Sequence, residues 1–114
     1  MFVLLIACSK DEIDDLKFYS GVLVVKGICM NYVIQVLDDD FPRDLLETNW
    51  INEFSDQEFQ NVFALGSVCD FPEYIDQGDS FNFLIDDNKE NLCAVCLAYS
   101  PVPQKRVSIT VVEN

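Results

Sequence analysis

Residues 17–37 have the sequence KFYSGVLVVKGICMNYVIQVL. Two runs within it, 17–26 and 29–37, are rich in the β-branched and aromatic side chains that favour strands. A short turn at Gly27 separates them, and two such runs joined by a short turn form a hairpin. The sequence therefore predicts a β-hairpin over this stretch, which ends at three consecutive aspartates.

Further short strands are predicted after this hairpin, at residues 60–66, 80–85, 92–99 and 106–112. Clusters of Gly, Pro, Asn and Asp separate them and mark turns. We also expect a helical turn over 42–47, with Pro42 near its start, whereas 49–54 is ambiguous. Five to six short strands with almost no helix predict an all-β fold, a small antiparallel OB-like barrel. A compact β-sandwich is the alternative.

The composition indicates one globular domain. The chain has 114 residues, 50% of them hydrophobic and 12% aromatic, which is enough to bury a core. Seven Lys and Arg stand against 20 Asp and Glu, so the net charge is -13. Because phosphate backbones are bound through Lys and Arg, we expect no nucleic-acid partner. The charge suits a soluble surface, a basic partner or a divalent cation.

The sequence offers no recognisable catalytic or cofactor chemistry. It contains no histidine, the residue that normally activates a cysteine nucleophile, and no phosphate-binding loop, nucleophile elbow or His-based metal motif. The acidic loops 38–40 and 86–90 are rich in oxygen but lack the EF-hand pattern, so we interpret them as charged turns. We expect no enzymatic activity, no cofactor and no metal site.

The N-terminus, MFVLLIACSKDEIDD, changes from apolar to acidic at Cys8. Residues 5–8, Leu-Ile-Ala-Cys, resemble a bacterial lipobox, in which the signal peptidase cuts before a cysteine that carries acyl chains. Residues 9–12 resemble the acidic export signal of Bacteroidetes surface lipoproteins. The resemblance implies a signal-peptide remnant at 1–7, an acidic tether at 8–17, a β-barrel domain at 18–114 and a membrane anchor at Cys8.

One feature of that segment departs from a signal peptide, because no Lys or Arg precedes the apolar run. The alternative for this segment is a buried first strand over residues 2–6, with Cys8 as a small core residue.

The body of the chain resembles small uncharacterised Bacteroidetes lipoproteins. The matching segments are Cys29 with Tyr32-Val33-Ile34-Gln35-Val36, Cys69-x-x-Pro72, Gly78-Asp79-x-Phe81-x-Phe83 and Cys93-x-x-Cys96-Leu97-Ala98. The resemblance implies a lipid-anchored protein of the outer membrane or cell surface, or alternatively a periplasmic one. It brings no catalytic residues with it.

Four cysteines remain besides Cys8, namely Cys29, Cys69, Cys93 and Cys96. An even number in a small exported domain predicts two disulfides, with three possible connectivities. We expect Cys29 and Cys69 to be tied to the Cys93–Cys96 segment. A Cys₄ zinc site would need two close pairs, and a redox centre would need a helix after Cys96; only one close pair exists, and Pro101 and Pro103 follow it.

Recognition is expected on loops, where small domains usually place it. These loops are residues 38–54, 71–77 and 86–91. The candidates within them are a ligand groove at Trp50, Phe54 and Phe71 and an acidic patch at Asp38, Asp39 and Asp40. We expect a monomeric, non-catalytic surface lipoprotein that binds an unidentified protein or ligand. The alternatives are an acidic inhibitor or immunity-type protein that binds a basic partner, and an enzyme with a carboxylate pair.

Overall fold

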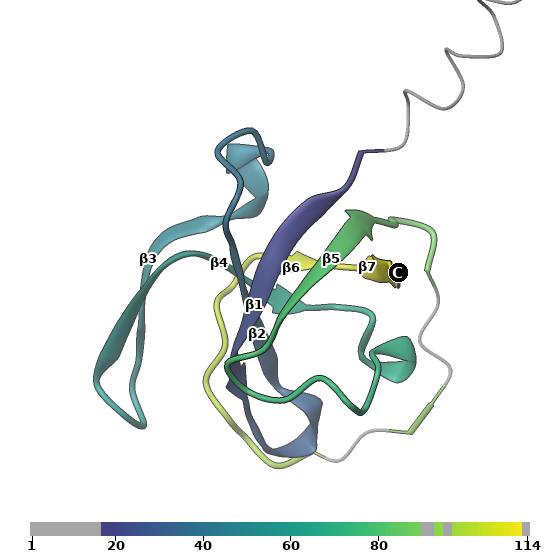
Figure 1. The fold of residues 1–114 in the computed structure, drawn as a ribbon. Helices are drawn as coiled ribbons and strands as arrows, with labels where there is room; N and C mark the ends of the chain where they lie inside the picture. Colours follow the sequence, from purple (N-terminus) through teal and green to yellow (C-terminus); the bar gives the residue numbers. More distant parts are fainter. Residues whose placement is uncertain (1–16, 90–92, 95–96, 113–114) are drawn as a thin grey trace, which may run out of the picture.

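The computed structural model describes residues 17–89, 93–94 and 97–112. They form seven strands and three short 3₁₀ turns (Figure 1). The strands are β1 (Tyr19–Lys26), β2 (Tyr32–Val36), β3 (Glu47–Asn52), β4 (Gln57–Leu65), β5 (Ser80–Ile85), β6 (Arg106–Val107) and β7 (Ile109–Val112). The turns are η1 (Ile28–Met30), η2 (Arg43–Leu45) and η3 (Val68–Asp70).

The strands form one sheet that closes on itself. Six strands follow the order β3-β4-β2-β1-β5-β7, and all neighbours in this order are antiparallel. β6 pairs in parallel with the end of β4, at Ala64 and Leu65. Because only Ser108 separates β6 from β7, this pairing joins the two sides of the sheet into a barrel. The all-β prediction of a small OB-like barrel is confirmed.

A buried hydroxyl extends the closure beyond the two residues of β6. Ser67, which follows β4, is 2% exposed. Its hydroxyl donates to the carbonyl oxygen of Ile109 and accepts the Ile109 backbone N–H, both at 2.8 Å. The Ser67 side chain therefore satisfies both backbone groups of the first residue of β7, as a neighbouring strand would.

Aromatic side chains fill the barrel. Phe41, Phe63 and Phe83 are fully buried; the Phe41 and Phe63 rings stack at 5.9 Å, and Phe83 meets Phe63 edge-on at 6.0 Å. Gly21 in β1 makes room for them, because a Cβ there would lie 3.0 Å from the Phe83 ring and 3.1 Å from Ile34. Any side chain at this position would push β1 away from the core.

The predicted hairpin over 17–37 is confirmed. β1 and β2 pair along most of their length, with a shift in register between Leu23 and Val25 that marks a β-bulge. The connection contains η1, in which Cys29 and Met30 have left-handed φ angles of 57° and 62°. The predicted helical turn after Pro42 is confirmed too, as η2.

Three details differ from the predicted strands. The described residues of 92–99, namely 93–94 and 97–99, form no strand; Pro101 and Pro103 follow, and they lack the backbone N–H that pairing requires. The single strand predicted at 106–112 is divided into β6 and β7. The ambiguous stretch 49–54 contributes most of β3, so the sheet has seven strands where five to six were predicted.

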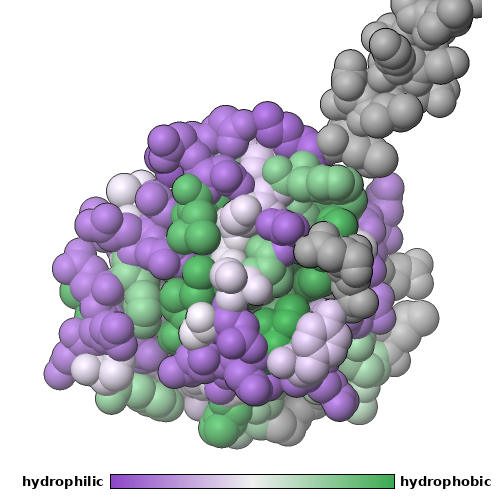
Figure 2. All heavy atoms as spheres, viewed as in Figure 1, coloured by the Kyte–Doolittle hydropathy of each residue, from purple (hydrophilic) through white to green (hydrophobic). Residues whose placement is uncertain are grey.

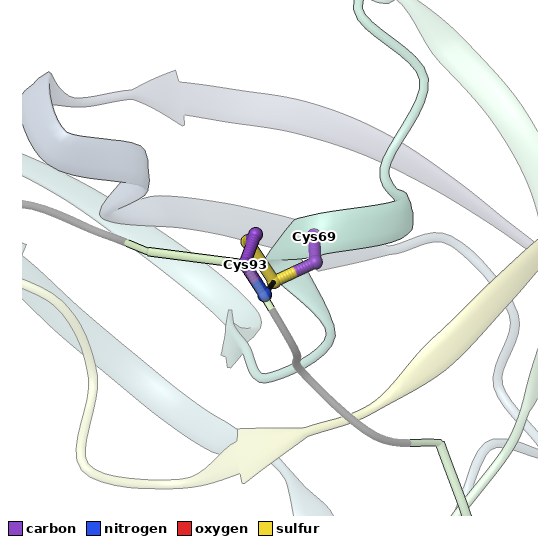
Figure 3. The surroundings of a disulfide bond; sticks show 2 residues. All are labelled: Cys69 and Cys93. Carbon is purple, nitrogen blue, oxygen red and sulfur yellow. Dashed lines mark hydrogen bonds between the residues drawn. A yellow bond between two sulfur atoms is a disulfide. The ribbon is translucent and has the colours of Figure 1, made fainter.

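One disulfide is fully described. Cys69 in η3 is bonded to Cys93, with the Cα atoms 5.6 Å apart (Figure 3). The bond ties the end of β4 to the segment between β5 and β6, as the sequence predicts for Cys69. Cys29 is disulfide-bonded as well. Cys96 lies outside the described residues, as do Cys8 and the segments predicted as signal peptide and alternative first strand.

Candidate functional site

The β3–β4 hairpin extends beyond the barrel (Figure 1). β4 pairs with β2 only from Val62 to Ala64, and with β3 from Gln57 to Val62. Asn61 marks the point where β4 leaves the barrel, since its φ of 57° interrupts the extended backbone. The Arg43 guanidinium donates a hydrogen bond of 3.1 Å to the Asn61 side chain. The outer part of β4 and the whole of β3 therefore form a separate two-stranded arm.

The tip of this arm is ordered by one asparagine. The Asn52 side-chain oxygen accepts the Phe54 backbone N–H at 3.0 Å. Its backbone carbonyl accepts the N–H groups of Ser55 and Asp56, at 3.2 and 2.7 Å. Asn52 is itself buried, and Asp56 takes a left-handed φ of 61°, a conformation that aspartate tolerates well. The side chains next to the turn are therefore held in fixed directions.

Aromatic rings lie along the arm. Trp50 and Phe59 face each other across the two strands and stack at 5.9 Å. At the tip, Phe54 meets Tyr99 edge-on at 5.9 Å, and the Tyr99 hydroxyl donates to Glu53 at 3.3 Å. Desolvation and the adjacent Glu53 carboxylate raise the pKa of the Tyr99 phenol. Phe54 and Tyr99 remain 67% and 64% exposed, so this aromatic surface is open to a partner.

The arm is strongly acidic. Residues 47–60 contain four carboxylates, Glu47, Glu53, Asp56 and Glu58, and no Lys or Arg. Within the described residues, the three ion pairs use aspartates outside the arm. Hydrophilic residues also predominate on the side of Figure 2 where the arm lies, whereas hydrophobic residues gather in the middle of that face. The uncompensated carboxylates give the arm a field that attracts cations.

The predicted acidic patch at 38–40 divides into separate roles. The Asp38 carboxylate accepts the Ser20 backbone N–H at 2.6 Å and so fastens the start of β1. Asp40 forms an ion pair of 2.6 Å with Lys17, which lowers the pKa of the Asp40 carboxyl. Asp39 is exposed and makes no side-chain bond to another described residue. Two of the three carboxylates thus already serve contacts within the chain.

The predicted aromatic groove is only partly assembled. Trp50 and Phe54 both lie on the β3–β4 arm. Phe71 is 9% exposed and belongs to the core, where its ring meets Tyr32 and Phe81 edge-on at 5.7 and 5.5 Å. The side chains that complete the aromatic surface are instead Phe59 and Tyr99. The sequence alone gave little indication of these two residues. Phe59 is brought to Trp50 by the pairing of β3 with β4, and Tyr99 is brought to Phe54 by the return of residues 97–103.

Two hollows lie on the surface of the described residues. One of about 750 Å³ is lined partly by Leu37, Tyr74, Phe81 and Val111. The other, of about 640 Å³, is lined partly by Met30, Val68, Leu97 and Tyr99. The first is also lined by the carboxylate residue Asp79, and the second by Arg106. Across the described residues, no cluster of three or more metal-binding side chains is present, and no helix is long and apolar enough to span a bilayer.

Comparison with protein-family models, with curated proteins and with solved structures found no match for this chain. The candidate site is therefore defined by its geometry: an acidic and aromatic β-arm attached to a disulfide-bonded barrel.

Proposed function

We propose that this protein is a non-catalytic, lipid-anchored binding domain of the outer membrane or cell surface, and that it captures a basic protein partner on the β3–β4 arm. The observation that carries the proposal is that one projecting arm combines the exposed Phe54 ring and the half-buried Trp50 and Phe59 rings with four carboxylates and no cation. Aromatic anchors within a complementary charged rim are typical of protein interfaces.

Export is supported by the cysteines. The Cys69–Cys93 disulfide belongs to an oxidising compartment, because cytosolic thiols are kept reduced. Together with the lipobox-like residues before Cys8, it favours a protein that has crossed the inner membrane. Several acyl chains on one cysteine form a stable anchor.

The anchor is tested by expressing the full chain in a bacterium with lipoprotein processing enzymes. We expect mass spectrometry to find the chain cut before Cys8 and acylated there, in the detergent phase. The variant Cys8→Ala should remain uncut and move to the aqueous phase. An unmodified wild-type chain in the aqueous phase would contradict the anchored location while leaving the binding proposal open to its own test.

The binding surface is tested by pull-down from envelope extracts of the host. The variant with Trp50→Ala, Glu53→Gln and Glu58→Gln should lose a partner that the wild type retains, and rising salt should weaken wild-type capture because exposed charges are screened. The matched control carries Glu73→Gln and Asp87→Asn, two exposed carboxylates elsewhere on the chain. A partner that binds all three proteins equally at every salt concentration would refute this surface.

A second candidate function is an acidic inhibitor of the immunity type, which covers a basic toxin. The same uncompensated carboxylates favour it, since interfaces of opposite charge associate rapidly. The two functions are separated by what is captured: a toxin whose activity falls on binding identifies the inhibitor, whereas an envelope protein that keeps its activity identifies the surface receptor.

A further inference from the structure

The outer edge of β3 is unpaired. Within the described residues β3 forms its ladder with β4 alone, while β4 pairs on both sides. No described backbone or side-chain group hydrogen-bonds to the outer side of Glu47–Ile51. An edge strand of this kind presents a row of free N–H and C=O groups, on which another strand can form a ladder. Figure 1 shows the β3–β4 arm projecting to one side of the barrel.

The usual devices that block such an edge are missing from β3. Its sequence, ETNWIN, contains no Lys and no Pro, and at six residues it is as long as β5. The pairing with β4 keeps one register from Asn49 to Asn52, so no bulge turns this part of the edge away. The feature that remains around this edge is the negative charge of the arm, which disfavours acidic partners and attracts basic ones.

That charge decides between the possible occupants. A second copy of this chain would bring a second arm with four carboxylates and no Lys or Arg beside this one, and surfaces of like charge repel each other. A segment with Lys or Arg side chains would instead meet opposite charges. The edge therefore fits a basic segment of another protein better than it fits a dimer.

The side chains of the arm indicate what such a segment contains. Ile51 and Glu58 are paired across the strands and are both exposed, so they share one face of the arm. A Lys or Arg on an added strand could lay its methylene stem on Ile51 and direct its charge toward Glu58. On the opposite face, the next residue of the added strand would lie beside Trp50, which suits an apolar side chain.

From these features we propose that β3 binds an extended segment of a partner, with alternating basic and apolar residues, as an added β-strand. This inference rests on the proposed function and adds the mode of recognition. Backbone hydrogen bonds to Glu47–Asn52 supply the pairing, and the alternation on the two faces supplies the selectivity.

The test uses synthetic peptides of about eight residues, long enough to cover β3. The first peptide alternates Lys and Val. The second has the same sequence, with N-methyl groups on the backbone nitrogens of every other residue, which all lie along one edge of the added strand. The third carries the N-methyl groups on the remaining residues, along the other edge. Because N-methylation removes backbone donors and keeps the charge, one methylated peptide should bind at least about tenfold more weakly than the first. Binding is followed by Trp50 fluorescence, since the chain has one tryptophan.

Protein variants supply the second arm of the test. Glu58→Lys should weaken the unmethylated peptide about tenfold or more, and Asp87→Lys, an equal charge change at a distant exposed loop, should weaken it far less. Amide exchange in the complex should slow specifically in β3. A Glu-Val peptide should not bind.

Several outcomes would overturn the inference. If the methylated peptides bind as tightly as the first, while Glu58→Lys weakens all of them, strand addition is refuted and the acidic arm remains the binding surface. If Glu58→Lys has no effect on peptide or envelope partner, the proposed function fails as well. No peptide binding up to about 1 mM, or dimerisation of the free protein that Glu58→Lys strengthens, would also refute the added strand.

Discussion

Tyr99 and Glu53 are joined by a hydrogen bond of 3.3 Å from the phenol to the carboxylate, between a segment that returns to the barrel and the tip of the β3–β4 arm. The Tyr99 ring also packs edge-on against Phe54. These two contacts attach the arm to residues 97–103, whose end leads into β6 and the barrel closure. The direction of the arm is therefore set by tertiary contacts as well as by its own turn.

Removing these contacts should loosen the arm more than it destabilises the protein. We expect Tyr99→Phe, which removes only the hydrogen bond, to change the free energy of unfolding very little, because Tyr99 is exposed. Tyr99→Ala also removes the ring contact and should lower it somewhat more. Amide exchange at Ser55 and Asp56 should accelerate in both variants, and equal exchange in the wild type and Tyr99→Ala would contradict this attachment.

The aromatic core should dominate stability. Phe83 is fully buried and its ring contacts Tyr19, Phe41 and Phe63, so Phe83→Ala should lower the free energy of unfolding by about 3 to 5 kcal/mol. Phe18→Ala is the matched control, because Phe18 is 55% exposed and should cost less than about 0.5 kcal/mol. Urea unfolding measures both, and similar losses would contradict the assigned core.

The barrel was predictable because its strands carry their own signal. β1 and β2 are dense in Val, Ile, Leu and Tyr, and in β1 buried and less buried side chains alternate, which matches the pattern of a half-buried sheet. The closure of the barrel was harder to predict from the sequence, because it depends on two residues of β6 and on the buried hydroxyl of Ser67. Pairings this short have no recognisable pattern in the amino-acid sequence.

The arm was only partly predictable. Its strands contain Asn, Gln and Glu, residues that are infrequent in strands, and pairing between them is what brings Trp50 onto Phe59. The acidic run at 38–40 is prominent in the sequence, yet Asp38 and Asp40 contact Ser20 and Lys17, about twenty residues away along the chain. Local charge does not reveal such partners.

The cysteines should be oxidised in the native protein. Cys69 and Cys93 are separated by 24 residues, and closing a loop of this length stabilises a fold by about 3.5 kcal/mol in the chain-entropy model. The double variant Cys69→Ser, Cys93→Ser should therefore unfold at lower urea concentration by a corresponding amount. Thiol titration of the unfolded, unreduced wild type should find no free thiol other than Cys8; four reactive thiols or bound zinc would contradict the predicted pairs.

The Lys17–Asp40 pair should have a measurable titration signature. The hydrogen bond from Lys17 lowers the pKa of the Asp40 carboxyl below its ordinary value of 3.8, and the same contact raises the pKa of Lys17 above 10.5. Because the Asp40 pKa is lowered on folding, the pair stabilises the fold above pH 3.8, and this stabilisation is lost as the pH falls through the folded Asp40 pKa. Because the Lys17 pKa is raised on folding, the pair stabilises the fold below pH 10.5, and this stabilisation is lost as the pH rises through the folded Lys17 pKa. The pair should thus act between these limits.

Carboxyl NMR titration of Lys17→Met tests this pair directly. The Asp40 pKa should rise to its ordinary value or above, because desolvation, which raises it, remains when the lysine is gone. Any stability difference from the wild type should appear at neutral pH and disappear at both extremes. Lys105→Met is the control: Lys105 donates to the Asp44 backbone carbonyl at 2.7 Å and not to Asp40, so the Asp40 titration should be unchanged. An Asp40 pKa that is equal in the wild type and Lys17→Met would show that Lys17 does not hold this carboxylate in solution.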